Sequence, residues 1–105
     1  MMDKKVIYIS GPITGDPEYR KAFDKAEAEL TAAGYIALNP AKLPEGMTPE
    51  RYMRIDLAML DAADAIYMLN RWEWSKGASL ELSYCFYIRK PFATSLHDLK
   101  LIFGR

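Results

Sequence analysis

The chain has 105 residues, half of them hydrophobic, and its 14 basic and 14 acidic residues balance to a formal net charge of zero. This composition predicts one globular domain over residues 1–105 and excludes a disordered chain. The lack of net positive charge argues against partners such as nucleic acid polymers or membrane surfaces. With one cysteine, Cys85, and one histidine, His97, we expect no disulfide and no metal site, and a reducing, cytoplasmic location. The residues before the first apolar run are too few for a signal peptide or a membrane span.

Apolar runs alternate along the chain with helical repeats, and turn residues separate them. The first apolar run ends at Gly11-Pro12, and the helical repeat after it stops at Gly34. A capping residue, a proline and an acid mark two helix starts, at 16–18 and 48–50. We therefore expect strands at 6–10, 35–38, 65–69 and 92–96, helices at 16–33, 48–63 and 80–88, a loop at 41–47, and a short strand or surface segment at 99–103.

This alternation predicts an α/β fold, a three-layer flavodoxin- or Rossmann-like sandwich with a mostly parallel sheet of four to five strands in the order 2-1-3-4. Ligands of such folds bind at the carboxyl ends of the strands. Four loops should gather there, at 10–15, 39–43, 70–77 and 95–98, and Asn39 of the second is a candidate for substrate binding.

The first of these loops carries two glycines and two hydroxyl groups directly after a strand. Its candidate binding residues are Ser10, Gly11, Pro12, Thr14 and Gly15. Backbone amides in such a loop can hold an anion or a sugar. The loop matches neither a P-loop nor a G-x-G-x-x-G fingerprint, and a tight structural turn is an equally good interpretation.

The third loop leads into a helix that carries Glu81, and it contains the candidate binding residues Trp72, Trp74, Ser75 and Gly77. Two tryptophans in a polar loop are typical of a stacking surface, and a core or subunit-interface position is the alternative. We expect Glu81 at the bottom of an aromatic-walled pocket, where a carboxylate can act as a nucleophile. The alternative is a surface glutamate that the helix dipole stabilises.

Asp56 is the second carboxylate of interest. It follows Tyr52 by four residues and precedes Leu60 by four, so it shares a helix face with apolar side chains. A buried carboxylate is costly unless it is hydrogen-bonded or functional, and we favour function over a surface position.

Taken together, these motifs make the chain similar to the nucleoside 2-deoxyribosyltransferase superfamily, which includes the 2′-deoxynucleoside 5′-monophosphate N-glycosidases. It looks closest to a small phage and bacterial branch. The resemblance extends from residue 7 to about residue 96 and rests on the segments 8–15, 63–66 and 75–81 and on Asp56.

The resemblance implies a role for each matching residue. Glu81 matches the nucleophile that attacks the anomeric carbon of deoxyribose, Asp56 matches the acid that assists proton transfer, and Tyr8 matches a tyrosine that positions the nucleophile. Ser75 and Gly77 match residues that face the 5′ end of the nucleotide. Pro12 stands where the monophosphate hydrolases have a phosphate-binding serine, so a requirement for the 5′-phosphate stays open.

The implied activity is cleavage or transfer at the N-glycosidic bond of a (deoxy)nucleoside or its 5′-monophosphate, without a cofactor. In relatives, the helices that bear the catalytic acids form subunit interfaces, and the apolar helices here predict a homodimer or higher homo-oligomer. Hydrolase and transferase stay open, as do the base and the sugar. Two other functions also stay open: a nucleotide-binding or sensing module without turnover, and a structural protein that kept only the fold. Convergence of Glu81 and Asp56 beside Tyr8 would favour the enzyme.

Overall fold

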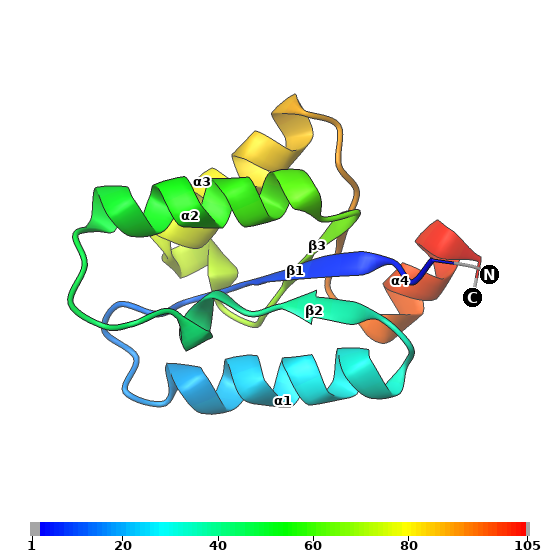
Figure 1. Cartoon of the computed structure of the whole chain (residues 1–105), viewed down its shortest axis with the longest axis horizontal. Coiled ribbons are helices and arrows are strands. Elements are labelled where there is room, and N and C mark those ends of the chain that lie inside the picture. The colour runs from blue at the N-terminus through cyan, green and yellow to red at the C-terminus, as the bar shows by residue number, and fades with distance from the viewer. Residues whose placement is uncertain (1–2, 105) are drawn as a thin grey trace.

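The computed structural model describes residues 3–104, which form a sheet covered by helices on both faces (Figure 1). The four strands are all parallel and lie in the order β2-β1-β3-β4, so the predicted fold class and strand order are confirmed. The strands are β1 (Val6–Ser10), β2 (Ile36–Leu38), β3 (Ala65–Met68) and β4 (Phe92–Ala93). The helices are α1 (Tyr19–Ala32), α2 (Pro49–Ala62), α3 (Lys76–Tyr87) and α4 (Leu96–Phe103), with two short 3₁₀ helices, η1 (Pro40–Lys42) and η2 (Trp72–Trp74). Within residues 3–104, no helix is both long and apolar enough to cross a membrane.

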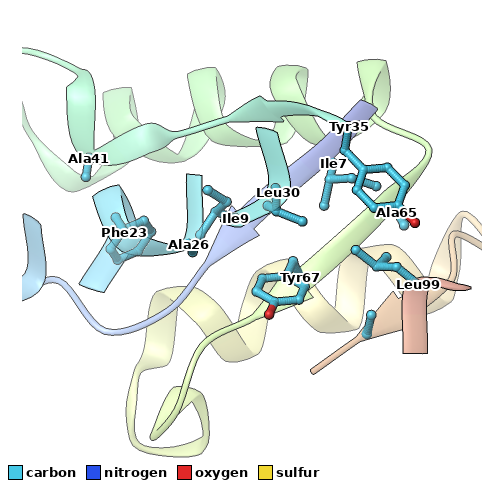
Figure 2. Close-up of a cluster of buried hydrophobic side chains, with 11 residues drawn as sticks. Ile7, Ile9, Phe23, Ala26, Leu30, Tyr35, Ala41, Ala65, Tyr67 and Leu99 are labelled. Atoms are coloured by element: carbon cyan, nitrogen blue, oxygen red, sulfur yellow. The ribbon is translucent and has the colours of Figure 1, made fainter. Parts of the chain in front are cut away.

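The strands send alternate side chains to two different cores. Ile7 and Ile9 of β1 point toward α1 and α4, where they pack with Phe23, Leu30 and other apolar residues (Figure 2). The intervening Tyr8 faces α2 and α3 and packs with Leu60, Leu82 and other apolar residues. This alternation is the period-two geometry of a strand, and in a sheet buried on both faces it lets one strand serve two layers.

Gly11, directly after β1, is required by the close approach of a neighbouring segment. A Cβ atom at this position would lie 2.8 Å from Cβ of Leu69, which follows β3. Any larger residue would push these two chain segments apart at the edge of the sheet where the carboxyl ends of the strands meet.

Two helices begin at residues other than those predicted. The first helix begins at Tyr19 instead of Asp16, because the Asp16 carboxylate accepts the N–H of Glu18 at 2.9 Å in a turn that precedes the helix. The third helix begins at Lys76 instead of Leu80, because Ser75 caps it: its Oγ accepts the N–H of Ala78 at 3.1 Å. Thr48 caps α2 as the sequence predicts.

The C-terminal segment differs most from its prediction. The strand expected at 92–96 is only two residues long, and the strand or surface segment expected at 99–103 is a helix. Ser95 and Asp98 explain the difference, because the Ser95 Oγ accepts the Asp98 N–H at 3.1 Å and the Asp98 carboxylate accepts the Thr94 N–H at 2.9 Å. These reciprocal bonds start the helix, and burial of Leu99 fixes it to the sheet.

Candidate active site

A cavity of about 620 Å³ opens at the carboxyl end of β1, within the size range of small-molecule sites. It is lined by β1 and the loop after it, the first turns of α1, the segment from η1 into α2, and the segment from η2 into α3. Most of the lining side chains are apolar or aromatic, including Ile13, Tyr19, Phe23, Leu43, Met47, Tyr52, Met53 and Trp74. The polar side chains of the lining include two buried carboxyl groups, those of Asp56 and Glu81.

Glu81 lies in the second turn of α3 and is only 5% exposed. Two hydroxyl groups of β1 hold its carboxylate: Tyr8 donates to Oε2 at 3.1 Å, and Ser10 donates to Oε1 at 2.6 Å. Tyr8 and Ser10 reach it because alternate residues of β1 face α3. The other residues on this face of α3, Ala78, Leu82 and Cys85, pack in the core and fix the position of the helix.

Asp56 lies on the buried face of α2 and is 8% exposed. Its Oδ1 atom is buried and has no hydrogen-bond partner among residues 3–104. A buried, unpartnered carboxyl oxygen is unfavourable for folding, so its retention inside a cavity indicates a group that meets a ligand.

The two carboxyl groups affect each other's ionisation. Burial raises the pKa of Glu81 to about 8, and the charge of Asp56 adds to this rise, while the Ser10 and Tyr8 hydrogen bonds oppose it. Burial also raises the pKa of Asp56. Burial and the charge of Glu81 raise the pKa of Tyr8 well above 10, so Tyr8 stays a hydrogen-bond donor. At neutral pH the carboxyl pair therefore keeps one proton between its two members.

The hydrogen bonds and the interaction between the two carboxyl groups act in opposite directions on this shared proton. Each oxygen of Glu81 accepts one O–H donor, and the 2.6 Å bond from Ser10 has the length of a hydroxyl bound to an ionised carboxylate. The interaction between the two carboxyl groups, in contrast, raises the pKa of Glu81 and lowers that of Asp56. The proton therefore belongs to the pair and not to one of its members.

Most of the residues predicted from the sequence line this one cavity. They are Tyr8, Ser10, Gly11, Thr14, Asp56, Trp74, Ser75, Gly77 and Glu81. Trp74 lies at the edge, with 81% of its surface exposed. Ser75 lines the cavity while its hydroxyl also caps α3.

Four of the predicted residues lie outside the cavity lining: Pro12, Gly15, Asn39 and Trp72. Asn39 caps η1, accepting the Ala41 N–H at 2.9 Å, and its amide donates to carboxylates of α1. Trp72 packs against the core around Tyr8. Gly15 has φ of +83° and makes a turn. Residues 95–98, a loop expected at the same edge, instead form the cap and the first residues of α4.

The sequence predicts the loop at 39–43 at this edge of the sheet but gives no indication of residues 44–49. Glu45 and Met47 line the cavity beside Leu43 of the expected loop. Tyr52 also lines it, and its spacing of four residues from Asp56 is the signal that places both on one helix face. Lys76, which lies in the expected loop at 70–77 without being named as a site residue, adds a cation to the lining.

Within residues 3–104, no group of three or more His, Cys, Asp or Glu side chains comes together that could hold a metal ion. The chain matches no curated protein. Residues 5–93, which include all of the cavity-lining residues, match the family described as a domain of unknown function, DUF4406. The chain therefore belongs to the DUF4406 family.

Proposed function

We propose that this protein cleaves the N-glycosidic bond of a (deoxy)nucleoside or its 5′-monophosphate, with water or a second base accepting the sugar. One observation carries the proposal: two buried carboxyl groups, Glu81 and Asp56, share the floor of a cavity with apolar and aromatic walls. Cleavage of this bond requires a carboxylate beside the anomeric carbon and an acid beside the departing base. The resemblance to the nucleoside 2-deoxyribosyltransferase superfamily supports the same two roles.

In the first step, an oxygen of Glu81 attacks the anomeric carbon and forms a glycosyl ester. The electrons of the broken carbon–nitrogen bond pass to the base, whose nitrogen takes, through Asp56, the proton that the carboxyl pair shares. The sugar carries positive charge in the transition state, and the Glu81 carboxylate stabilises it. Tyr8 and Ser10 hold one carboxylate oxygen each, so Glu81 is oriented before the substrate arrives.

In the second step, water or another base attacks the same carbon and displaces Glu81. Asp56, now ionised, takes the proton released by the attacking group, and the carboxyl pair returns to its starting state. Hydrolysis and transfer therefore use the same residues and differ only in which nucleophile reaches the ester first.

The walls of the cavity suit a flat heteroaromatic base. Tyr19 and Trp74 provide aromatic surfaces for stacking, and Leu43 and Met47 provide apolar contacts. We propose small molecules as substrates and neither a nucleic acid polymer nor a membrane as a partner. We also propose a cytoplasmic location, with which the free, buried Cys85 is consistent.

The test is a screen of the four common deoxynucleosides, the ribonucleosides and their 5′-monophosphates for released base, measured by liquid chromatography. The Glu81→Gln protein is the control, and an added second base distinguishes transfer from hydrolysis. Intact-mass measurement of the wild type should show a glycosyl adduct that Glu81→Gln lacks. Failure to release a base from any of these compounds, with tight binding of one of them, would instead support a binding module without turnover.

Self-association is a further part of the proposal. Leu80, Phe86, Tyr87 and Phe92, on α3 and β4, are large apolar residues with at least 44% of their surface exposed. Such a patch is typical of a subunit interface. We expect light scattering at micromolar concentration to give the mass of at least a dimer, and Tyr87→Asp to reduce it; a monomeric wild type would contradict this expectation.

A further inference from the structure

Residues 43–47, here called the wall loop, connect η1 to the cap of α2 and contain no helix or strand. Leu43, Glu45 and Met47 line the cavity, yet no residue of the loop is buried in either core. Leu43 and Met47 are only half-buried, so polar contacts contribute to the position of the loop.

Tyr52 makes two of these contacts through one hydroxyl group. The hydroxyl donates to the carbonyl oxygen of Pro44 at 2.6 Å and accepts the N–H of Met47 at 3.2 Å. Pro44 and Met47 are positions i and i+3 of a four-residue turn, and Gly46, with φ of +97°, occupies position i+2, where a type II turn requires a positive φ. The tyrosine hydroxyl thus bridges the two backbone groups that such a turn normally joins directly.

The wall loop has a second, weaker tether. Arg20 of α1 approaches Glu45 at 3.6 Å, and both side chains are largely exposed, 48% and 77% respectively. An ion pair so open to solvent contributes little to holding a loop in place. The Leu43 N–H donates to the Pro40 carbonyl oxygen at 3.1 Å where the loop leaves η1. Beyond that bond, the Tyr52 hydroxyl makes the main polar contacts of the wall loop.

We infer that Tyr52 is a positioning residue, and that the wall loop it holds determines which leaving groups the cavity accepts. Tyr52 precedes Asp56 by one helical turn, so the same face of α2 carries the tether of the wall and the proposed proton donor. The hydroxyl thus fixes the apolar wall relative to the acid that must reach the base. The expected kinetic effects rest on the proposed function, whereas the hydrogen bonds from Tyr52 to the wall loop do not.

The first test measures the loop without reference to activity. Tyr52→Phe keeps the ring and removes the hydroxyl, so hydrogen–deuterium exchange at the Met47 amide should become at least about tenfold faster. Tyr84→Phe is the matched control, because the Tyr84 hydroxyl also donates a hydrogen bond, to Asp61 at 2.7 Å, and Tyr84 lies outside the cavity lining. Unchanged exchange at Met47 in a folded Tyr52→Phe protein would overturn the inference.

The second test uses the substrate found by the screen. Tyr52→Phe should raise KM about five- to tenfold, keep kcat within about twofold and narrow the preference between purine and pyrimidine bases. An unchanged KM and base preference would overturn the specificity role, and a loss confined to kcat would place Tyr52 in the chemical step instead.

A second variant, Gly46→Ala, tests the wall loop in case Tyr52→Phe does not fold. Gly46→Ala strains the same turn at a position where no atom lies within 4 Å of the added Cβ. It should raise Met47 exchange and KM in the same direction, and a failure to do either would count against the wall loop. If the wild type releases no base from any compound, the proposed function fails, and the exchange measurement alone still decides whether Tyr52 holds the loop.

Discussion

The two faces of the sheet differ in chemistry although the same strands build both. On the face covered by α1 and α4, β1 contributes Ile7 and Ile9 to a core of apolar residues. On the face covered by α2 and α3, the same strand contributes Tyr8 and Ser10, which hold a buried carboxylate. The first arrangement is favourable for folding, because it removes apolar surface from water.

The second arrangement is unfavourable for folding by itself, because it buries two carboxyl groups of which one has an unpartnered oxygen. The apolar face stabilises the fold and thereby permits a destabilising group on the opposite face. Such a separation is expected where a protein must keep a reactive group in an unfavourable electrostatic environment. Stability and activity should therefore respond separately to substitutions on the two faces.

The largest effect is expected from Glu81→Gln, which removes the proposed nucleophile and keeps the shape of the side chain. Turnover should fall by several orders of magnitude, as when a covalent nucleophile is lost, while circular dichroism shows an unchanged fold. Asp56→Asn and Tyr8→Phe should lower turnover less, since they assist bond cleavage without forming the new bond. Full activity of Glu81→Gln would show that the nucleophile has been assigned wrongly.

The opposite pattern, a loss of stability with unchanged activity, is expected on the apolar face. Leu30 of α1 is fully buried and lies outside the cavity lining, so Leu30→Ala should lower the free energy of unfolding by about 2–5 kcal/mol, measured by urea denaturation. Below the unfolding temperature, kcat and KM should stay at wild-type values. A large fall in kcat with an intact fold would show that the two faces are not independent.

The third effect is the pH dependence of stability. The folded pKa of Glu81 is about 8, against an ordinary value of 4.5, so the native carboxyl pair keeps a proton that the unfolded chain loses. The native state therefore binds more protons between these values, and the free energy of unfolding should fall as pH rises from about 4.5 to about 8, on the order of a few kcal/mol in total. Glu81→Gln should reduce this fall and be more stable than the wild type at pH 8, and the part that remains comes from Asp56, whose pKa burial also raises.

Glu27 provides a control of opposite sign for this experiment. Hydrogen bonds from Asn39 and Lys42 lower the pKa of Glu27, so its contribution to stability is present above its ordinary pKa and is lost as pH falls. Glu27→Gln should therefore leave the fall between about pH 4.5 and pH 8 unchanged. If Glu81→Gln and the wild type lose stability equally over this range, the raised pKa of the carboxyl pair is wrong.

The strand order could be predicted from the alternation of strands and helices, because crossovers between parallel strands are right-handed. The positions of Tyr8 and Asp56 depend on local periods: alternation in β1 places Tyr8 on one face, and a spacing of four residues places Asp56 beside Leu60 on α2. Residues 44–47 of the wall loop were not predicted as part of the site, because a bridge from Tyr52 to Pro44 and Met47 leaves no periodic signal. The start of α4 was missed because a short apolar run is compatible with strand or helix, and the bonds between Ser95 and Asp98 decide between them.

The smallest effects are expected at Gly77, where one substitution should raise stability and weaken substrate binding. Gly77 is the second residue of α3 and lines the cavity, and an added Cβ would lie 3.8 Å from Cε of Met53 and 4.0 Å from Oγ of Ser75. These are ordinary contacts, so Gly77→Ala should fold without strain. Because alanine favours helix over glycine, the variant should gain up to about 1 kcal/mol of stability.

The same methyl group occupies space that a ligand needs at the start of α3, so KM should rise about two- to fivefold while kcat changes little. Ser83→Ala is the matched control, since Ser83 is an exposed residue of the same helix outside the cavity lining. It should also raise the unfolding temperature slightly through helix propensity, with no change in KM. If Gly77→Ala and Ser83→Ala behave alike in both measurements, the start of α3 does not contact the ligand, and the glycine serves only the backbone.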